Sequence, residues 1–168
     1  MEIVVNDTNI LIDLYNAGLM TYCKHLHLDF RTLDVVMNEI EVKEQIDAVQ
    51  KLVDDGFLKV CSLSSEQMQK VSYKIGEYQG ICNLSLEDIS VMVYAQDNNC
   101  RLLTGDKTLR DKATIENIKV SGILYLTDLM TSQGVVSNSQ MRTALQLLLD
   151  SNNRLPKKLI KERMEKLK

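Results

Sequence analysis

Acidic residues recur in this sequence at the ends of predicted strands and at the starts of predicted helices. The four that matter here are Asp7, Glu39, Asp88 and Asp106. Carboxylates that converge on one pocket repel each other, and a divalent cation placed among them removes much of that cost. Hard oxygen ligands without nearby His or Cys favour Mg²⁺ or Mn²⁺ over zinc. If the fold brings these acids together, the sequence predicts a metal site suited to nuclease chemistry on a phosphodiester.

Short apolar runs alternate with segments of helical spacing along most of the chain. The predicted strands are residues 3–5, 33–36, 57–61, 101–103 and 123–126, and the predicted helices between them include 43–54, 65–79, 86–98 and 128–133. Strands that alternate with helices predict an α/β fold, in which a parallel sheet is covered by helices on both faces. Ligands bind beyond the carboxyl ends of the strands in such a sheet. Asp7, Glu39 and Asp106 each follow a predicted strand, so this arrangement places them at that edge.

The last third of the chain has a different pattern. Residues 139–149 and 156–167 have helical spacing with no predicted strand between them, and Pro156 suits the first turn of the second helix. These helices form either an appended pair or an arm that packs against a partner.

Length and composition indicate one compact globular unit. The chain has 168 residues, of which 45% are hydrophobic, and contains only 7 Gly and 1 Pro. Polar residues interrupt every apolar run before a membrane span is reached, and residues 1–7 do not resemble a secretory signal. We therefore predict a cytoplasmic protein without a membrane partner.

The charge is distributed unevenly along the chain. Residues 151–168 hold seven basic and two acidic residues, whereas residues 1–150 hold 13 basic and 21 acidic ones. A polyanion would meet the basic tail first, so Lys157, Lys158 and Lys161 are candidate RNA contacts, although a solvated helix face explains them equally well. Lys107 and Arg110, which follow Asp106, carry the same two interpretations.

Histidine and cysteine residues do not form a recognisable metal motif. His25 and His27 lack a matching Cys or third His, and the four cysteines contain no C-x-x-C pair. We interpret the cysteines as buried thiols.

Four segments, in order, resemble the PIN-domain ribonucleases, a family that includes VapC-like toxins of prokaryotic toxin–antitoxin pairs. The segments are 4–12, where a strand ends in Asp7; 35–40, with Glu39; 84–95, where a helix begins near Asp88; and 102–107, with Thr104 and Asp106 at a strand end. Together they span roughly residues 1–135. The remainder, 136–168, resembles the C-terminal helical extension of a subgroup of the family and carries the basic tail of this chain.

The resemblance implies a three-layer α/β/α domain and a Mg²⁺- or Mn²⁺-dependent endoribonuclease. By it, Asp7, Asp88 and Asp106 would bind metal, Glu39 would complete the catalytic set, and Asn9 and Thr104 would orient carboxylates or water. It further implies an RNA substrate, a cognate antitoxin whose basic side chain plugs the acidic pocket, and a homodimer.

Each acid also has a purely structural interpretation. Asp7 and Asp106 fit helix caps after buried strands, and Asp88 fits the first turn of a helix that Ser85 caps. Glu87 would point in a different direction around that helix, and Glu39 has Glu41 as a neighbouring surface charge.

Other α/β acid sites fit this sequence less well. A haloacid-dehalogenase-type phosphatase needs Asp-x-Asp after its first strand, where this chain has Asp7, Thr8 and Asn9. A receiver domain needs an Asp after its third strand, which the run at residues 57–61 does not provide. A PIN-like module that binds RNA or protein without cleaving remains the alternative.

Overall fold

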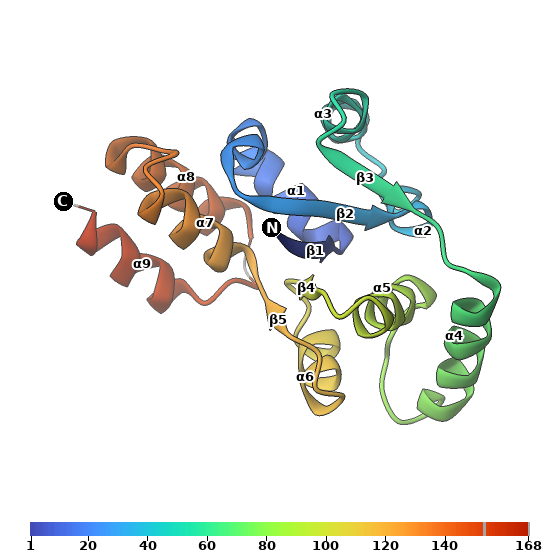
Figure 1. Cartoon of the computed structure of the whole chain (residues 1–168). Helices are drawn as coiled ribbons and strands as arrows, with labels where there is room; N and C mark the ends of the chain where they lie inside the picture. Colours follow the sequence, from blue (N-terminus) through green and yellow to red (C-terminus); the bar gives the residue numbers. More distant parts are fainter. Residues whose placement is uncertain (153, 168) are drawn as a thin grey trace.

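The computed structural model describes residues 1–152 and 154–167, and its centre is a parallel sheet of five strands (Figure 1). The strands are β1 (Glu2–Asn6), β2 (Leu28–Leu33), β3 (Leu58–Cys61), β4 (Arg101–Leu103) and β5 (Val120–Ser121). Their order in the sheet is β3-β2-β1-β4-β5, and every pairing is parallel. The first strand of the chain therefore lies in the middle, and the sheet grows outward from it in both directions.

Helices cover both faces of this sheet. They are α1 (Thr8–Asn16), the 3-10 helix η1 (Met20–His25), α2 (Asp34–Met37), α3 (Lys43–Asp54), α4 (Ser65–Tyr78), α5 (Leu86–Asp97), α6 (Lys107–Ile115), α7 (Ile123–Ser132), α8 (Asn138–Ser151) and α9 (Lys157–Lys166). One core joins the sheet to α1, α3, α7, α8 and α9, and the other joins it to α4, α5 and α6. Val4 belongs to the first core and Val5 to the second, as the alternation of side chains along a strand requires. The predicted three-layer α/β/α fold with a central parallel sheet is confirmed.

Two predicted strands are wrong. Residues 33–36 end β2 and begin α2, so the strand lies earlier, at Leu28–Leu33. Asp29 and Arg31 interrupt the apolar pattern of this strand, so the sequence did not reveal it. In the structure their side chains form an ion pair with a nitrogen–oxygen distance of 2.7 Å. Residues 123–126 are the first turn of α7, whose buried positions recur at helical spacing, and the edge strand β5 is only two residues long.

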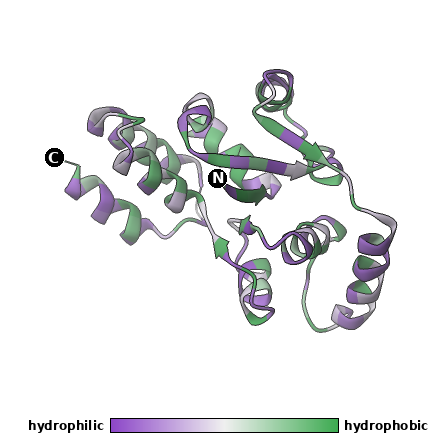
Figure 2. Cartoon of the chain, viewed as in Figure 1, coloured by the Kyte–Doolittle hydropathy of each residue, from purple (hydrophilic) through white to green (hydrophobic). Residues whose placement is uncertain are grey.

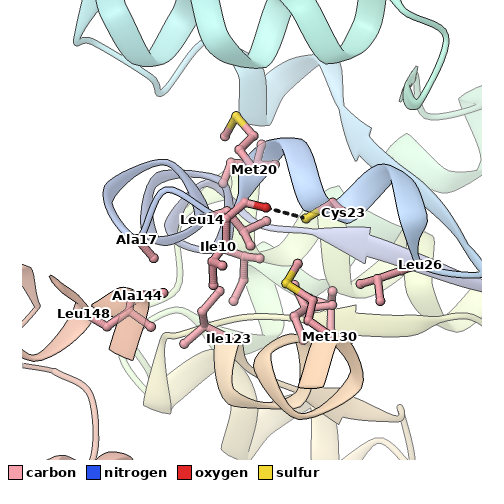
Figure 3. Packing of buried hydrophobic residues seen from close by; sticks show 14 of the residues in the cluster. Ile10, Leu14, Ala17, Met20, Cys23, Leu26, Ile123, Met130, Ala144 and Leu148 are labelled. Atoms are coloured by element: carbon pink, nitrogen blue, oxygen red, sulfur yellow. Dashed lines mark hydrogen bonds between the residues drawn. The ribbon is translucent and has the colours of Figure 1, made fainter. Parts of the chain in front are cut away.

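The two C-terminal helices share the main core with the rest of the chain. In α8, Ala144 and Leu148 are buried near Ile10 and Leu14 of α1, which Figure 3 shows, and Ile160 of α9 belongs to the same cluster. Away from this cluster, α9 is largely hydrophilic (Figure 2). Much of the apolar surface of α8 and α9 therefore packs on this chain itself, while Leu147 and Leu159 stay exposed.

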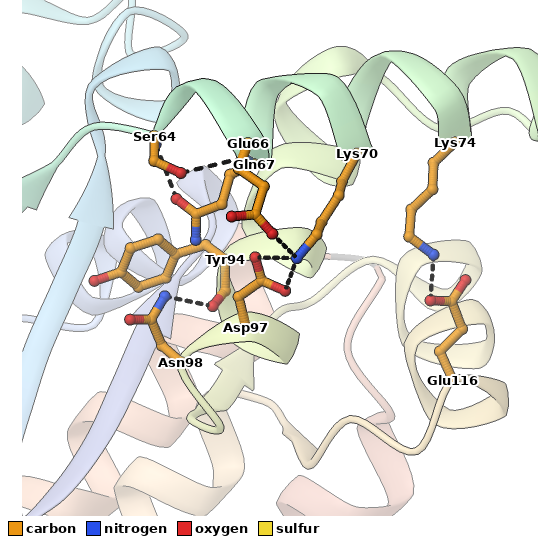
Figure 4. Close-up of polar contacts among 9 residues, drawn as sticks. All are labelled: Ser64, Glu66, Gln67, Lys70, Lys74, Tyr94, Asp97, Asn98 and Glu116. Atoms are coloured by element: carbon orange, nitrogen blue, oxygen red, sulfur yellow. Dashed lines mark hydrogen bonds and ion pairs between the residues drawn. The ribbon is translucent and has the colours of Figure 1, made fainter.

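Ion pairs fasten the outer helix α4 to its neighbours (Figure 4). Lys70 binds Asp97 at the end of α5, and Lys74 binds Glu116 beyond α6. Ser64 caps α4 through a capping box with Gln67.

The cysteines contribute to packing. Cys23 and Cys100 are buried, Cys61 and Cys82 are half-buried, and all four are free thiols. Burial raises the pKa of the Cys23 thiol to about 12, so it stays protonated.

Across the described residues, none of the helices combines the length and apolar character needed to span a bilayer.

Candidate active site

The four predicted acids line one pocket at the carboxyl edge of the sheet. The pocket has a volume of about 300 Å³, and its lining comprises Asp7, Thr8, Asn9, Glu39, Ser85, Asp88 and Asp106. These residues come from segments that are far apart in the sequence and meet at the ends of β1 and β4. The expected convergence of the four carboxylates is present.

The strands β1 and β4 lie side by side, which brings Asp7 and Asp106 to the same point. The backbone amide of Asp7 donates to the carbonyl of Leu103 at 3.0 Å. The hydroxyl of Thr104 donates to Asp7 and accepts from the backbone amide of Asp106 at 3.0 Å. Thr104 is fully buried and so ties the two acids together. Since β2 and β4 flank β1 on opposite sides, the pocket lies at the topological switch point where α/β sheets bind ligands.

Asp7 is the most deeply buried of the four acids, with 4% of its surface exposed. Desolvation is the main cause that raises the pKa of its carboxyl to about 7. Hydrogen bonds from Thr104 and from the amide of Ile10 oppose that rise, while the charge of Asp88 adds to it. Because burial disfavours the charged form of Asp7, a cation bound nearby would stabilise this carboxylate.

Asp106 caps α6 and Asp88 lies in the first turn of α5, and both also line the pocket. The amide of Leu109 donates to Asp106 Oδ1 at 2.7 Å, and the amide of Ser85 donates to Asp88 Oδ2 at 2.9 Å. Burial, followed by the charges of Asp106 and Glu87, raises the pKa of Asp88. The capping and site interpretations are therefore compatible, because each carboxylate has a second oxygen.

Glu39 reaches the pocket from a different kind of element than expected. It follows the short helix α2 and not a strand, and it is the most exposed of the four acids. Burial raises the pKa of the Glu39 carboxyl, and the charges of Glu87 and Asp88 add to that rise. The hydroxyl of Thr8 donates to Glu39 Oε2 and lowers this pKa. Thr8 therefore orients Glu39, and it lay beside Asp7 in the sequence without being recognised as a site residue.

The donor set of the pocket suits a hard cation. Carboxylate, hydroxyl and amide oxygens are the ligands that Mg²⁺ and Mn²⁺ prefer, and a Mg²⁺ site needs only one or two direct carboxylates because it retains water. Within residues 1–152 and 154–167, no three His, Cys, Asp or Glu side chains are already gathered closely enough to hold one ion. Water ligands or small rotations of the acids would complete a site here. His25 and His27 lie outside this lining.

The supporting and basic candidates are placed in different ways. Asn9 lines the pocket. Ser85 also lines it, although the sequence predicts only a helix-capping role for this residue. Lys107 and Arg110 line a separate, larger cleft next to the pocket. Lys157, Lys158 and Lys161 are exposed on α9 and lie outside both of these linings.

Comparison with known proteins identifies the family. A family model described as a PIN domain matches residues 3–168, nearly the whole chain. The chain belongs to the PIN-domain family. This PIN domain is 32% identical over 125 residues to Endoribonuclease Nob1 of Methanocaldococcus jannaschii, an alignment that covers 74% of this chain and 58% of that relative. It thus spans little more than half the length of the relative.

A solved structure shares the fold at lower identity. The crystal structure of VapBC2 from Rickettsia felis, bound to a DNA fragment from its promoter, contains a chain that superposes on this PIN domain with a TM-score of 0.55. The identity is 17%, and the match covers 71% of this chain and 98% of that one. This likeness supports the fold.

Proposed function

We propose that this PIN domain is a Mg²⁺- or Mn²⁺-dependent endoribonuclease that hydrolyses phosphodiester bonds in RNA. One observation carries the proposal: four carboxylates from distant parts of the sequence line a single pocket at the switch point of the sheet. A binding module that does not cleave has no need to accumulate acids in a place that repels RNA. The relationship to a protein named as an endoribonuclease agrees with this assignment.

The acids divide into two roles. Asp7, Asp88 and Asp106 would hold one or two ions, with Thr104 and Asn9 fixing the direction of Asp7. Glu39, oriented by Thr8, would complete the ligand set or orient the attacking water. When bound, the ion lowers the pKa of water and offsets charge on the phosphate. Attack by water on phosphorus and cleavage of the bond to the 3′ oxygen would leave a 3′-hydroxyl and a 5′-phosphate.

The test is cleavage of a mixed pool of RNA with Mg²⁺, with Mn²⁺ and with EDTA. Asp7→Asn keeps the size of the side chain and should abolish cleavage, while circular dichroism shows a folded protein. Asp111→Asn is the matched control, because Asp111 is exposed on α6 and does not line the pocket. Unchanged cleavage by Asp7→Asn, or equal cleavage in EDTA, would contradict the proposal.

A role as a toxin, with a cognate antitoxin and a homodimeric state, remains a prediction from the family resemblance. Induced expression in a host cell tests the toxin role, which requires growth arrest that Asp7→Asn prevents. Light scattering measures the oligomeric state. Expression of residues 1–135 alone tests the proposed boundary before the helical extension 136–168.

A further inference from the structure

A second cleft lies beside the acidic pocket and has the opposite charge. It has a volume of about 570 Å³ and is formed by the start of α6, by β5 and the start of α7, and by the segment that leads into α9. Four cationic side chains line it: Lys107, Arg110, Arg154 and Arg163. Asp128 is the one carboxylate in this lining. We call this feature the basic cleft.

Among the described residues, most of these cations form no ion pair, although the charge of Arg154 opposes the rise in the pKa of the buried Asp13 carboxyl. Arg163 binds Asp128 through two nitrogen–oxygen contacts of 2.7 Å each. In the part of the chain that the structure describes, Lys107, Arg110 and Arg154 form no ion pair with a carboxylate. Like charges that gather without partners repel each other, and an anionic ligand relieves that repulsion. Such a cleft on an otherwise acidic chain is therefore suited to a polyanion.

Two of the cations are held in place by the fold. Arg110 Nη2 donates to the carbonyl of Thr104 at 2.7 Å, and its guanidinium occupies space that a side chain at Gly122 would fill. An added Cβ at Gly122 would lie 2.7 Å from Arg110 Nη2. The glycine thus leaves room for the arginine.

Arg154 is anchored through a buried polar relay. Asn152 Oδ1 accepts from the backbone amide of Arg154 at 2.9 Å and from its Nε at 3.4 Å. Asn152 Nδ2 in turn donates to Asp13 Oδ1 at 2.8 Å, and only 2% of Asp13 and 7% of Asn152 is exposed. Burying a carboxylate and an amide costs free energy, which the hydrogen bond from Asn152 offsets for Asp13 Oδ1 only, since Asp13 Oδ2 has no hydrogen-bond partner among the described residues. The same hydrogen bond links the segment that carries Arg154 to α1.

The basic cleft lies next to the acidic pocket, and neighbouring residues of the chain line the two. Gly105 and Lys107 line the cleft, whereas Asp106, between them in sequence, lines the pocket. A Cβ on Gly105 would lie 3.6 Å from the Cβ of Asn9, another residue of the pocket. The phosphates that flank a phosphodiester bound at Asp106 could therefore contact the cations of the adjoining cleft.

The remaining lining of the cleft is mainly apolar and includes the ring of Tyr125 and the side chains of Pro156 and Leu159. Unpaired bases can contact such atoms, while a duplex presents mainly its phosphates and sugars. Resting on the proposed nuclease function, we infer that the basic cleft holds the backbone of single-stranded RNA next to its scissile bond, through Lys107, Arg110 and Arg154. The C-terminal segment thereby becomes part of the substrate site.

The test measures binding by fluorescence anisotropy in EDTA, so that RNA is not cleaved. The probe is a labelled single-stranded RNA of about 12 nucleotides, within the site sizes of single-strand binders. Arg154→Gln and Lys107→Gln should each weaken binding about tenfold and reduce the slope of log affinity against log salt by about 0.7. Arg142→Gln is the matched control, since Arg142 is exposed on α8 and lies outside the cleft.

Three results would overturn the inference. They are unchanged affinity in both cleft variants, an equal loss in Arg142→Gln, or equally tight binding of a duplex of the same sequence. If Arg154→Gln loses its fold by circular dichroism, Lys107→Gln decides, because Lys107 is exposed at the start of α6. Failure of the proposed function is distinguishable: the wild-type protein would then bind in this pattern but cleave nothing with Mg²⁺ or Mn²⁺.

Discussion

The acidic pocket and the basic cleft adjoin each other, but their charged side chains differ in burial and in the groups that hold them. The carboxylates of the pocket accept hydrogen bonds from backbone amides and hydroxyls, and Asp7 is almost fully buried. The cations of the cleft are long side chains, and Lys107 and Arg154 are exposed. The pocket acids are thus held mainly by backbone amides and hydroxyls, whereas in the cleft Arg110 and Arg154 are held by hydrogen bonds of their own side chains and Lys107 is exposed at the start of α6.

The two regions also depend on different parts of the chain. The pocket needs residues 7–106, but the cleft is complete only with the segment after α8. In our proposal the first region performs the chemistry and the second grips the substrate. Variants in the pocket should therefore reduce turnover, and variants in the cleft should reduce affinity.

The largest effect is expected from Asp88→Asn. Loss of one charge from the pocket should reduce the rate of cleavage by more than about 100-fold with little change in RNA affinity. Glu87→Gln is the matched control, because Glu87 is adjacent in sequence but does not line the pocket. Single-turnover kinetics and anisotropy measure the two quantities, and an equal loss of activity in both variants would remove the distinction between these neighbours.

A smaller loss is expected from Thr104→Val, which removes a hydroxyl that contacts both Asp7 and Asp106. The buried Asp7 carboxylate would lose a donor, so its pKa should rise further and the acidic limb of the pH–rate profile should move to higher pH. We expect activity to fall about 10- to 100-fold. Thr114→Val on α6 is the control, and a profile unchanged in position would contradict the role given to Thr104.

The third prediction concerns stability without metal. The pKa of Asp7 is raised to about 7 from an ordinary 3.8, so the folded chain holds a proton that the unfolded chain has released between these values. The stability that this group contributes is present below pH 3.8 and is lost as pH rises through 7. In EDTA, the free energy of unfolding of Asp7→Asn should exceed that of the wild type by about 4 kcal/mol at pH 8 and by little at pH 4. Urea unfolding at both pH values measures this, and a constant difference would refute it.

The smallest effect is expected at Gly122. Gly122→Ala should push the guanidinium of Arg110 from its position and weaken RNA binding about threefold, with the cleavage rate at saturation unchanged. Gly76→Ala in α4 is the control, since a Cβ there meets nothing within 4 Å. A loss of turnover instead of affinity would place Arg110 with the pocket.

The acids were readable in the sequence because strand ends and helix starts are local signals. Asp7 and Asp106 each follow a buried run and cap the next helix, and topology then brings them together. Strand β2 was misplaced because the ion pair of Asp29 and Arg31 interrupts its apolar pattern. Lys107 and Arg110 were predicted as candidate RNA contacts, but the sequence could not show that Arg154 lines the same cleft, because its position depends on the packing of α8 and on the link from Asn152 to Asp13.

The central position of β1 has a consequence for biosynthesis. Its Asp7 carboxylate is paired with Thr104, a residue 97 positions later. A growing polypeptide released from the ribosome only as far as β3 would display two of the four acids and lack the neighbouring strand that orients them. Under the proposed function, hydrolytic competence would therefore arise only after Asp106 and the strand before it have emerged.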